Sequence, residues 1–345
     1  MSNSSPSPAI SPEGEGSKNP LSIWVRARVK ARTFAIYVLL GLLLYFALRN
    51  APLADIWETL LKLQLWQVVI LLALNAIVYI LISLRWWLIV RTGNKSIAYL
   101  PLLAVRLAVF GVSYFTLGPQ VGGEPLQVLY LQRKHGITYT RATSTVVMDK
   151  LLEFLANFIL LGVGLTAIVQ AGILSTNGSR PFLSLIGLVI LLLWPPIHII
   201  LIYHDKYPLS VVLRKFTNNK SVRFIAASER MAGMFCRRNL TSLISAILIS
   251  VLAAVGMVAE FFCITFFLGI HLSFWQTIAA WTAGWLAFLV PLPGGLGALE
   301  ASQVFTLGTF GISAASAIGV TLLIRARDLL IGGLGLLIAS RGVNK

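Results

Sequence analysis

The stretch Pro291-Leu-Pro-Gly-Gly-Leu-Gly-Ala-Leu-Glu300 interrupts a long apolar tract in the second half of the chain. Its two prolines and three glycines oppose an uninterrupted helix. In the hydrocarbon core of a membrane, broken backbone and an ionisable side chain are tolerated only where they face protein or a water-filled cavity. The stretch therefore predicts a site inside a membrane protein.

The composition agrees with a membrane protein. Hydrophobic residues make up 57% of the 345 positions, charged residues 12%, and the mean hydropathy is +0.83, which is typical of a polytopic helical protein. The net charge of +16 is spread over the segments between apolar runs, which favours contact with anionic lipid over nucleic acid. Two cysteines and four scattered histidines give no metal-ligand spacing, so we expect neither a metal nor another cofactor.

The apolar runs predict an all-α integral membrane fold with about six spanning helices. Residues 1–31 predict a disordered tail with a basic end, and basic residues at both ends of the membrane domain put the N-terminus and residues 341–345 in the cytoplasm, as expected for a protein of the inner (plasma) membrane. A single membrane domain covers residues 32–340. The predicted spans are 34–48, 65–90, 142–169, 182–203, 240–268 and 315–339.

Two further apolar tracts are broken in the middle and predict re-entrant hairpins. The first enters over 97–117 and returns over 126–131, and the second enters over 274–290 and returns over 301–310. Glycines and prolines make the breaks: Gly118, Pro119, Gly122 and Gly123 in the first, and Pro293, Gly294, Gly295 and Gly297 in the second.

The order span, span, hairpin, span occurs twice, in residues 32–170 and 182–340. Lys150 follows Glu124 by 26 positions (150 − 124), and Arg325 follows Glu300 by 25 (325 − 300). Each base is followed three positions later by an acid, Glu153 or Asp328, on the same helix face. Three spans per half reverse the orientation. The pattern therefore predicts an inverted repeat, with Glu300 and Arg325 meeting Glu124 and Lys150.

Six of the twelve acidic residues fall at membrane depth, where one charge costs roughly 2.5–3.5 kcal/mol on insertion scales. Their position beside the breaks favours a functional role for Glu124 and Glu300. Structural pairing explains Lys150 with Glu153, and Arg325 with Asp328, as well as function does. Glu260 is either a proton-responsive carboxyl or a packing group. The six acids are Glu124, Asp149, Glu153, Glu260, Glu300 and Asp328.

Two basic features favour contact with lipid over a specific site. Arg85 precedes Trp86 and Trp87, which together predict an anchor at the membrane interface. The loop 204–238 is rich in arginine and lysine, and we expect part of it to lie on the bilayer surface as an amphipathic helix.

Several of these stretches together resemble a known family. Gly122-Gly-Glu-Pro-Leu-Gln127, Asp149-Lys150 with Glu153, the Pro291–Glu300 break and Arg325 resemble the flippase-like membrane region of the lysylphosphatidylglycerol synthases and its stand-alone relatives, over roughly Arg32 to Ser340. The resemblance implies movement of a polar-headed lipid between leaflets. The synthases add a C-terminal aminoacyl-transferase domain, and this chain ends at Lys345, so we do not expect lipid aminoacylation. Stand-alone relatives are thought to move other lipids, so the substrate does not carry over.

The leading hypothesis is a lipid flippase and not an enzyme. Lys150, Arg325 and Arg327 are suited to attract a phosphate, and Glu124 and Glu300 to bind a cationic group or a proton. The expected partners are membrane lipids (phospholipid, hopanoid or polyprenyl-linked). One alternative is an integral-membrane enzyme acting on a lipid phosphate or glycosyl group. The other is a non-catalytic partner of a lipid-modifying transferase. The predicted transport residues are Glu124, Asp149, Lys150, Glu153, Glu300, Arg325, Arg327 and Asp328.

Overall fold

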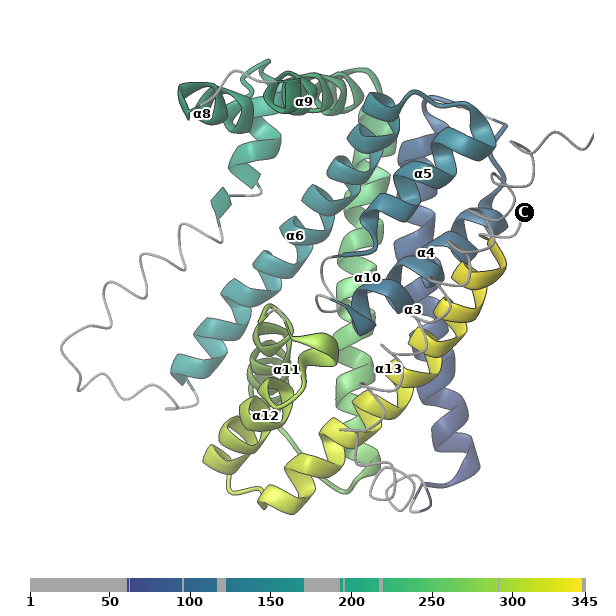
Figure 1. Cartoon of the computed structure of the whole chain (residues 1–345). Coiled ribbons are helices and arrows are strands. Elements are labelled where there is room, and N and C mark those ends of the chain that lie inside the picture. The colour runs from purple at the N-terminus through teal and green to yellow at the C-terminus, as the bar shows by residue number, and fades with distance from the viewer. Residues whose placement is uncertain are drawn as a thin grey trace, which may run out of the picture. The chain divides into compact units, whose positions relative to one another are not determined.

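A computed structural model describes residues 61–342, with gaps at 62, 95, 117–121, 171–192, 195, 217–219 and 291. All described residues belong to one compact unit, Leu43–Lys345. They form helices and no strand, which confirms the predicted all-α class for this part of the chain (Figure 1). The predicted tail, the first span, Gly118, Pro119 and most of the span 182–203 lie outside the described residues.

Four predicted spans correspond to the four longest helices. These are α3 (Leu65–Arg91), α6 (Tyr139–Gln170), α10 (Leu240–Phe267) and α13 (Ala314–Gly342). Among the described residues, α3 and α10 are long and apolar enough to cross a membrane, each with a stretch of mean hydropathy 2.5. The helices α6 and α13 are as long, but their interior charges lower their hydropathy.

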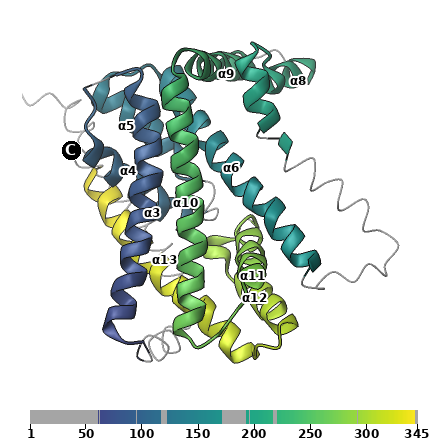
Figure 2. The same cartoon turned by 180° about the vertical axis from the view of Figure 1, so that it is seen from behind.

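The helices α3 and α10 pack side by side (Figures 1 and 2). The ring centroids of Trp66, at the start of α3, and Phe267, at the end of α10, are 5.3 Å apart. The two helices are therefore antiparallel. Their outer faces carry exposed apolar side chains such as Val69 and Leu252, as expected for surfaces in contact with lipid.

A helix pair flanks each predicted break; of the four residues predicted to make the first break, Gly122 and Gly123 are among the described residues. The first pair is α4 (Tyr99–Phe115) and α5 (Glu124–His135). The second is α11 (Phe274–Ala287) and α12 (Ala298–Thr309), with the short 3-10 helix η1 (Pro293–Gly295) between them. At the second break Gly294 has a φ of 57°, a conformation that favours glycine.

The helix after each break, α5 or α12, begins earlier than the sequence predicted, because a glutamate lies in its first turn. The Oε2 atom of Glu124 accepts a hydrogen bond of 2.8 Å from the backbone N–H of Gly122, and that of Glu300 accepts one of 3.0 Å from Gly297. A carboxylate at a helix N-terminus satisfies free N–H groups and complements the helix dipole. The predicted return segments therefore started two or three residues too late.

The two halves pack against each other through α4 with α13 and α11 with α6. The helices α4 and α13 approach closely, since a Cβ atom built on Gly335 would lie 2.1 Å from the carbonyl oxygen of Leu107. Small residues permit such close packing between membrane helices.

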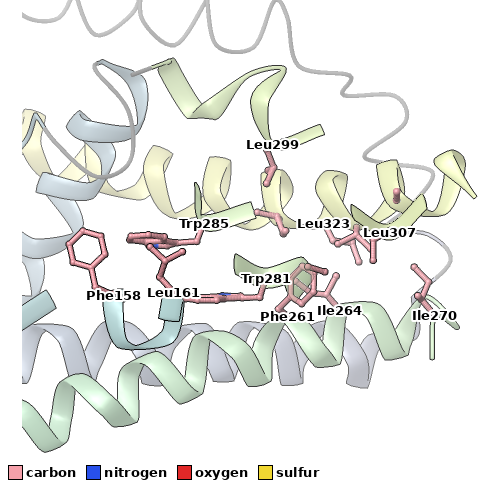
Figure 3. Close-up of a cluster of buried hydrophobic side chains, with 14 residues drawn as sticks. Phe158, Leu161, Phe261, Ile264, Ile270, Trp281, Trp285, Leu299, Leu307 and Leu323 are labelled. Atoms are coloured by element: carbon pink, nitrogen blue, oxygen red, sulfur yellow. The ribbon is translucent and has the colours of Figure 1, made fainter. Parts of the chain in front are cut away.

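A hydrophobic core joins α11 and α12 to the long helices (Figure 3). The rings of Phe158 on α6 and Trp285 on α11 meet edge to face, with centroids 5.8 Å apart. Leu299 on α12 is completely buried in the same cluster, beside Leu323 of α13. The second break is thus held by aromatic packing from both halves of the chain.

The basic loop 204–238 is mostly helical, as expected for part of it. It forms α8 (Pro208–Phe216) and α9 (Lys220–Arg238), which lie beyond one end of α6 and α10 (Figure 1). The buried carboxylate of Glu229 accepts hydrogen bonds from the backbone N–H groups of Leu209 (3.1 Å) and Ser210 (2.9 Å) at the start of α8. Burial opposes ionisation of Glu229, but hydrogen bonds from His198 and Ser210 hold its pKa below the ordinary value.

Candidate functional site

A cavity of about 210 Å³ is lined by residues of α3, α4, α5, α6, α10, α11, α12 and α13. Phe261, Trp281 and Trp285 form part of its apolar wall. Five of the eight predicted transport residues line it, whereas Asp149, Glu300 and Arg325 do not. The charged side chains of the wall are Arg85, Arg106, Glu124, Lys150, Glu153, Glu260, Arg327 and Asp328.

Two arginines and two carboxylates form the most buried network. Asp149, which is completely buried, accepts from Arg85 Nε at 2.7 Å and from Arg106 Nη1 at 2.8 Å. Glu153 Oε2 lies 3.2 Å from Arg85 Nη2 and 3.0 Å from Arg106 Nη2. Side chains of α3 and α4 thereby converge on one face of α6. Buried charges of this kind are stable only when paired and hydrogen-bonded.

Lys150 extends this network to the first break. Its Nζ atom lies 3.2 Å from Glu124 Oε1 and 3.2 Å from Glu153 Oε1. Glu124 and Lys150 are each 19% exposed, whereas Arg85 is 2% exposed, so the network has a buried end and an end open to the cavity. The predicted pairing of Lys150 with Glu153 is present, and Glu124 joins it.

Arg325 makes the corresponding connection at the second break. It forms an ion pair with Glu300, in which Nη2 lies 2.8 Å from Oε2. Its Nη1 atom also donates to the carbonyl oxygen of Gly294 at 3.1 Å. Glu124 and Glu300 therefore each bind a backbone N–H at their own break and a base on the next long helix.

Asp328 does not pair with Arg325, contrary to the pairing expected from their spacing. It accepts from Arg327, whose Nη2 atom lies 2.8 Å from Oδ1, because Arg325 is turned toward Glu300. The Nη1 atom of Arg327 lies 2.9 Å from Glu260 Oε2. Asn75 Nδ2 donates to both oxygens of Glu260 at 3.2 Å. Glu260 thus has two polar partners that its sequence context did not reveal.

The structure keeps the two break-linked pairs apart. Among the described residues no ion pair joins Glu124 or Lys150 to Glu300 or Arg325, and the second pair lies outside the cavity wall. The buried ring of Tyr114 contacts the second break, since a Cβ on Gly294 would lie 3.0 Å from it. The expected meeting of the four residues is therefore replaced by two separate pairs.

Sequence reasoning also missed Arg85 and Arg106. The interpretation of Arg85 as an interfacial anchor is wrong, because its side chain is buried and bound to Asp149 and Glu153. A count of the charges predicted at membrane depth in the first half would have indicated that further bases are needed. Glu124, Asp149 and Glu153 outnumber Lys150 by two, and buried acids require basic partners.

The open ends of these networks present cationic and anionic groups to one cavity. Lys150 and Arg327 can donate to phosphate oxygens, and Glu124 can accept from an ammonium group. The described residues contain no group of three His, Cys, Asp or Glu side chains placed to hold a metal ion.

Comparison with known proteins gives one result. A family model described as "Lysylphosphatidylglycerol synthase TM region" matches residues 33–335. No curated protein and no solved structure matches the chain. The family and the apolar helices α3 and α10 together make this a membrane protein with a lipid-related role. With most of its length matched, the chain belongs to the lysylphosphatidylglycerol synthase transmembrane-region family.

Proposed function

We propose that this protein is a lipid flippase that moves a polar-headed lipid between leaflets through this charged cavity. The observation that carries the proposal is the charged lining of that cavity inside a bundle of apolar helices. Charges at such depth are costly and usually mark a pathway or binding site. The acyl chains would remain in the bilayer while the head group crosses the cavity.

The exposed ends of the charge networks suit a head group containing phosphate. Lys150 and Arg327 are 19% and 24% exposed, so each can exchange its carboxylate partner for a ligand oxygen. Asp149 and Arg85 are almost inaccessible and would hold α3, α4 and α6 in place. We therefore assign head-group contact to Glu124, Lys150, Glu153 and Arg327, whereas the buried Asp328 would hold Arg327 in place. Glu300 and Arg325 would set the shape of the second break.

The two broken helix pairs are proposed to be re-entrant hairpins of an inverted repeat. Three relations support this. Glu124–Lys150 and Glu300–Arg325 make equivalent contacts, α4 packs on α13 as α11 packs on α6, and α3 pairs with α10 in antiparallel orientation. We propose six spans within residues 32–340, an inner-membrane location and cytoplasmic termini. Transporters of this design bind substrates at broken helices near the membrane midplane.

A reconstitution experiment tests the function. Purified protein in liposomes is offered labelled anionic, zwitterionic and polyprenyl-phosphate lipids while each leaflet is sampled over time. We expect faster equilibration of at least one lipid than in protein-free liposomes. Lys150→Met should slow it roughly 10- to 150-fold, the effect of losing one charge-assisted hydrogen bond of about 1.5–3 kcal/mol in the transition state. Asp205→Asn, at an exposed position, is the matched control.

The result of this experiment is decisive for the proposal. Equal rates with and without protein for every lipid class would refute flipping. Transport by Lys150→Met at the wild-type rate would show that the lipid does not pass through the cavity. For the repeat, cysteines at the exposed positions Ser273 and Lys134 should react with impermeant reagents from opposite sides of the membrane, and reaction from the same side would contradict it.

A further inference from the structure

The charges around the cavity balance everywhere except at one group. Arg85, Arg106 and Lys150 face three acids, Asp149 and Glu153 of α6 and Glu124 of α5. Arg325 faces Glu300. The remaining group has one guanidinium, on Arg327, between the two carboxylates of Glu260 and Asp328. These two acids are 2% and 7% exposed. One negative charge in this group therefore has no cationic partner among the described residues.

Asn75 supplies a second and independent observation at the same place. It is 5% exposed, lines the cavity beside Glu260, and its Oδ1 atom has no hydrogen-bond partner among the described residues. A buried acceptor normally has a donor. A water in the cavity that Asn75 lines would supply this donor, and it would connect Glu260 with the rest of the cavity through the Asn75 amide.

We propose that Glu260, Arg327 and Asp328, with Asn75, form a proton-binding site that holds one proton at neutral pH and exchanges it with the cavity. One proton converts the group from a net charge of −1 to neutral, and a buried unpaired carboxylate is neutralised in this way when it cannot be solvated. The step is a simple protonation of one carboxylate. On the proposed function, exchange of this proton would couple lipid movement to the proton gradient.

The neighbouring ionisable groups leave this assignment in place. Arg106 lies on the neighbouring helix α4 and Arg325 on α13 itself, but each is already bound to other acids. Tyr79 on α3, Tyr114 on α4 and Cys263 on α10 add no positive charge. From α6, Glu153 faces the same cavity and is balanced by its own bases.

The excess negative charge of Glu260, Arg327 and Asp328 is better suited to bind a proton than a metal cation. Arg327 lies within 2.9 Å of Glu260, so its positive charge opposes a sodium ion at the same carboxylates. The amide of Asn75 and the guanidinium of Arg327 are hydrogen-bonding groups suited to a carboxylic acid. The cavity has room for several waters, which would connect Glu260 and Asp328 with the solvent-accessible end of Lys150.

Infrared difference spectroscopy of the reconstituted protein tests the site without requiring transport. The wild-type protein should show the C=O band of a protonated carboxyl at neutral pH. Glu260→Gln and Asp328→Asn should each remove it, because the remaining acid then pairs with Arg327 alone. Glu229→Gln is the control, since that carboxylate is held ionised outside the membrane helices. Absence of the band, or a band that survives both substitutions, would overturn the proposal.

Two further arms separate the proton site from its rivals. Replacing choline by sodium as the cation of the buffer should leave the carboxyl band unchanged. Loss of the band in sodium would point to a sodium site and overturn the proposal. An imposed pH gradient should change the lipid transport rate of the wild type but not of Glu260→Gln. A carboxyl band in protein that moves no lipid would support the proton site and refute the flippase. Lipid transport by protein without the carboxyl band would support the flippase and refute the proton site.

Discussion

Replacing Asp149 by asparagine removes a completely buried charge from the network behind the cavity wall and leaves its neighbours unbalanced. Asp149 accepts two short bonds, of 2.7 Å from Arg85 and 2.8 Å from Arg106. A hydrogen bond to a charged group contributes about 1.5–3 kcal/mol, so two contribute about 3–6 kcal/mol. Breaking a buried ion pair by removing one partner costs a similar amount, about 3–5 kcal/mol. We expect Asp149→Asn to lower the free energy of unfolding by about 3–5 kcal/mol.

The size of this effect is checked by a double-mutant cycle with Arg85→Gln. The double variant removes one charge of each sign, so two bases still face two acids. Its loss of stability should be smaller than the sum of the single losses by about 1–3 kcal/mol. The free energy of unfolding can be measured by titration with SDS in mixed micelles, with tryptophan fluorescence as the signal. Losses that add without coupling, or a loss below about 1 kcal/mol for Asp149→Asn, would refute the role of this network.

Three other predictions concern packing, pH and the second break. Gly335→Ala should destabilise the protein by about 1–3 kcal/mol through overpacking against Leu107, whereas Gly333→Ala, with open space at its Cβ, should change stability by no more than about 1 kcal/mol in the same titration. Folding lowers the pKa of Glu229. The ionised carboxylate therefore contributes to the free energy of unfolding above the pKa of the unfolded state, and this contribution is lost as pH falls through the pKa of the folded state. Protection of the Leu209 and Ser210 amides from hydrogen exchange should therefore fall in acid, and Glu229→Gln should show no such pH dependence. Glu300→Gln should weaken the contact with Arg325 and increase amide exchange at Gly297 without affecting Gly122, and equal exchange at both breaks would contradict the independent roles of the two pairs.

Much of the architecture could be predicted because membranes leave the chain few options. Apolar runs of 27 or more residues had to be helices, and glycines with prolines had to break two others. The spacing from each break to the next base was equally informative, since Glu124–Lys150 and Glu300–Arg325 are both ion pairs. These relations are local or follow from a repeat, so sequence alone carries them.

The partners of the remaining charges could not be predicted in the same way. Arg85 and Asp149 are 64 positions apart, and Asn75 and Glu260 are 185 apart. Such contacts depend on which helix faces meet, and hydropathy does not encode this. The spacing of Arg325 and Asp328 was misleading, because Arg327 on an adjacent face is nearer to Asp328. A balance of buried charges would have indicated that α6 needs bases from other helices.

Filling the cavity tests whether a lipid head group passes through it. Ala253 is a buried wall residue of α10, and Val255 on the same helix is exposed away from the cavity. Ala253→Phe keeps every charge but occupies the passage, whereas Val255→Phe adds the same ring outside it. In reconstituted liposomes we predict that Ala253→Phe abolishes lipid translocation and that Val255→Phe retains the wild-type rate. Wild-type translocation by correctly folded Ala253→Phe protein would show that the head group does not pass through this cavity.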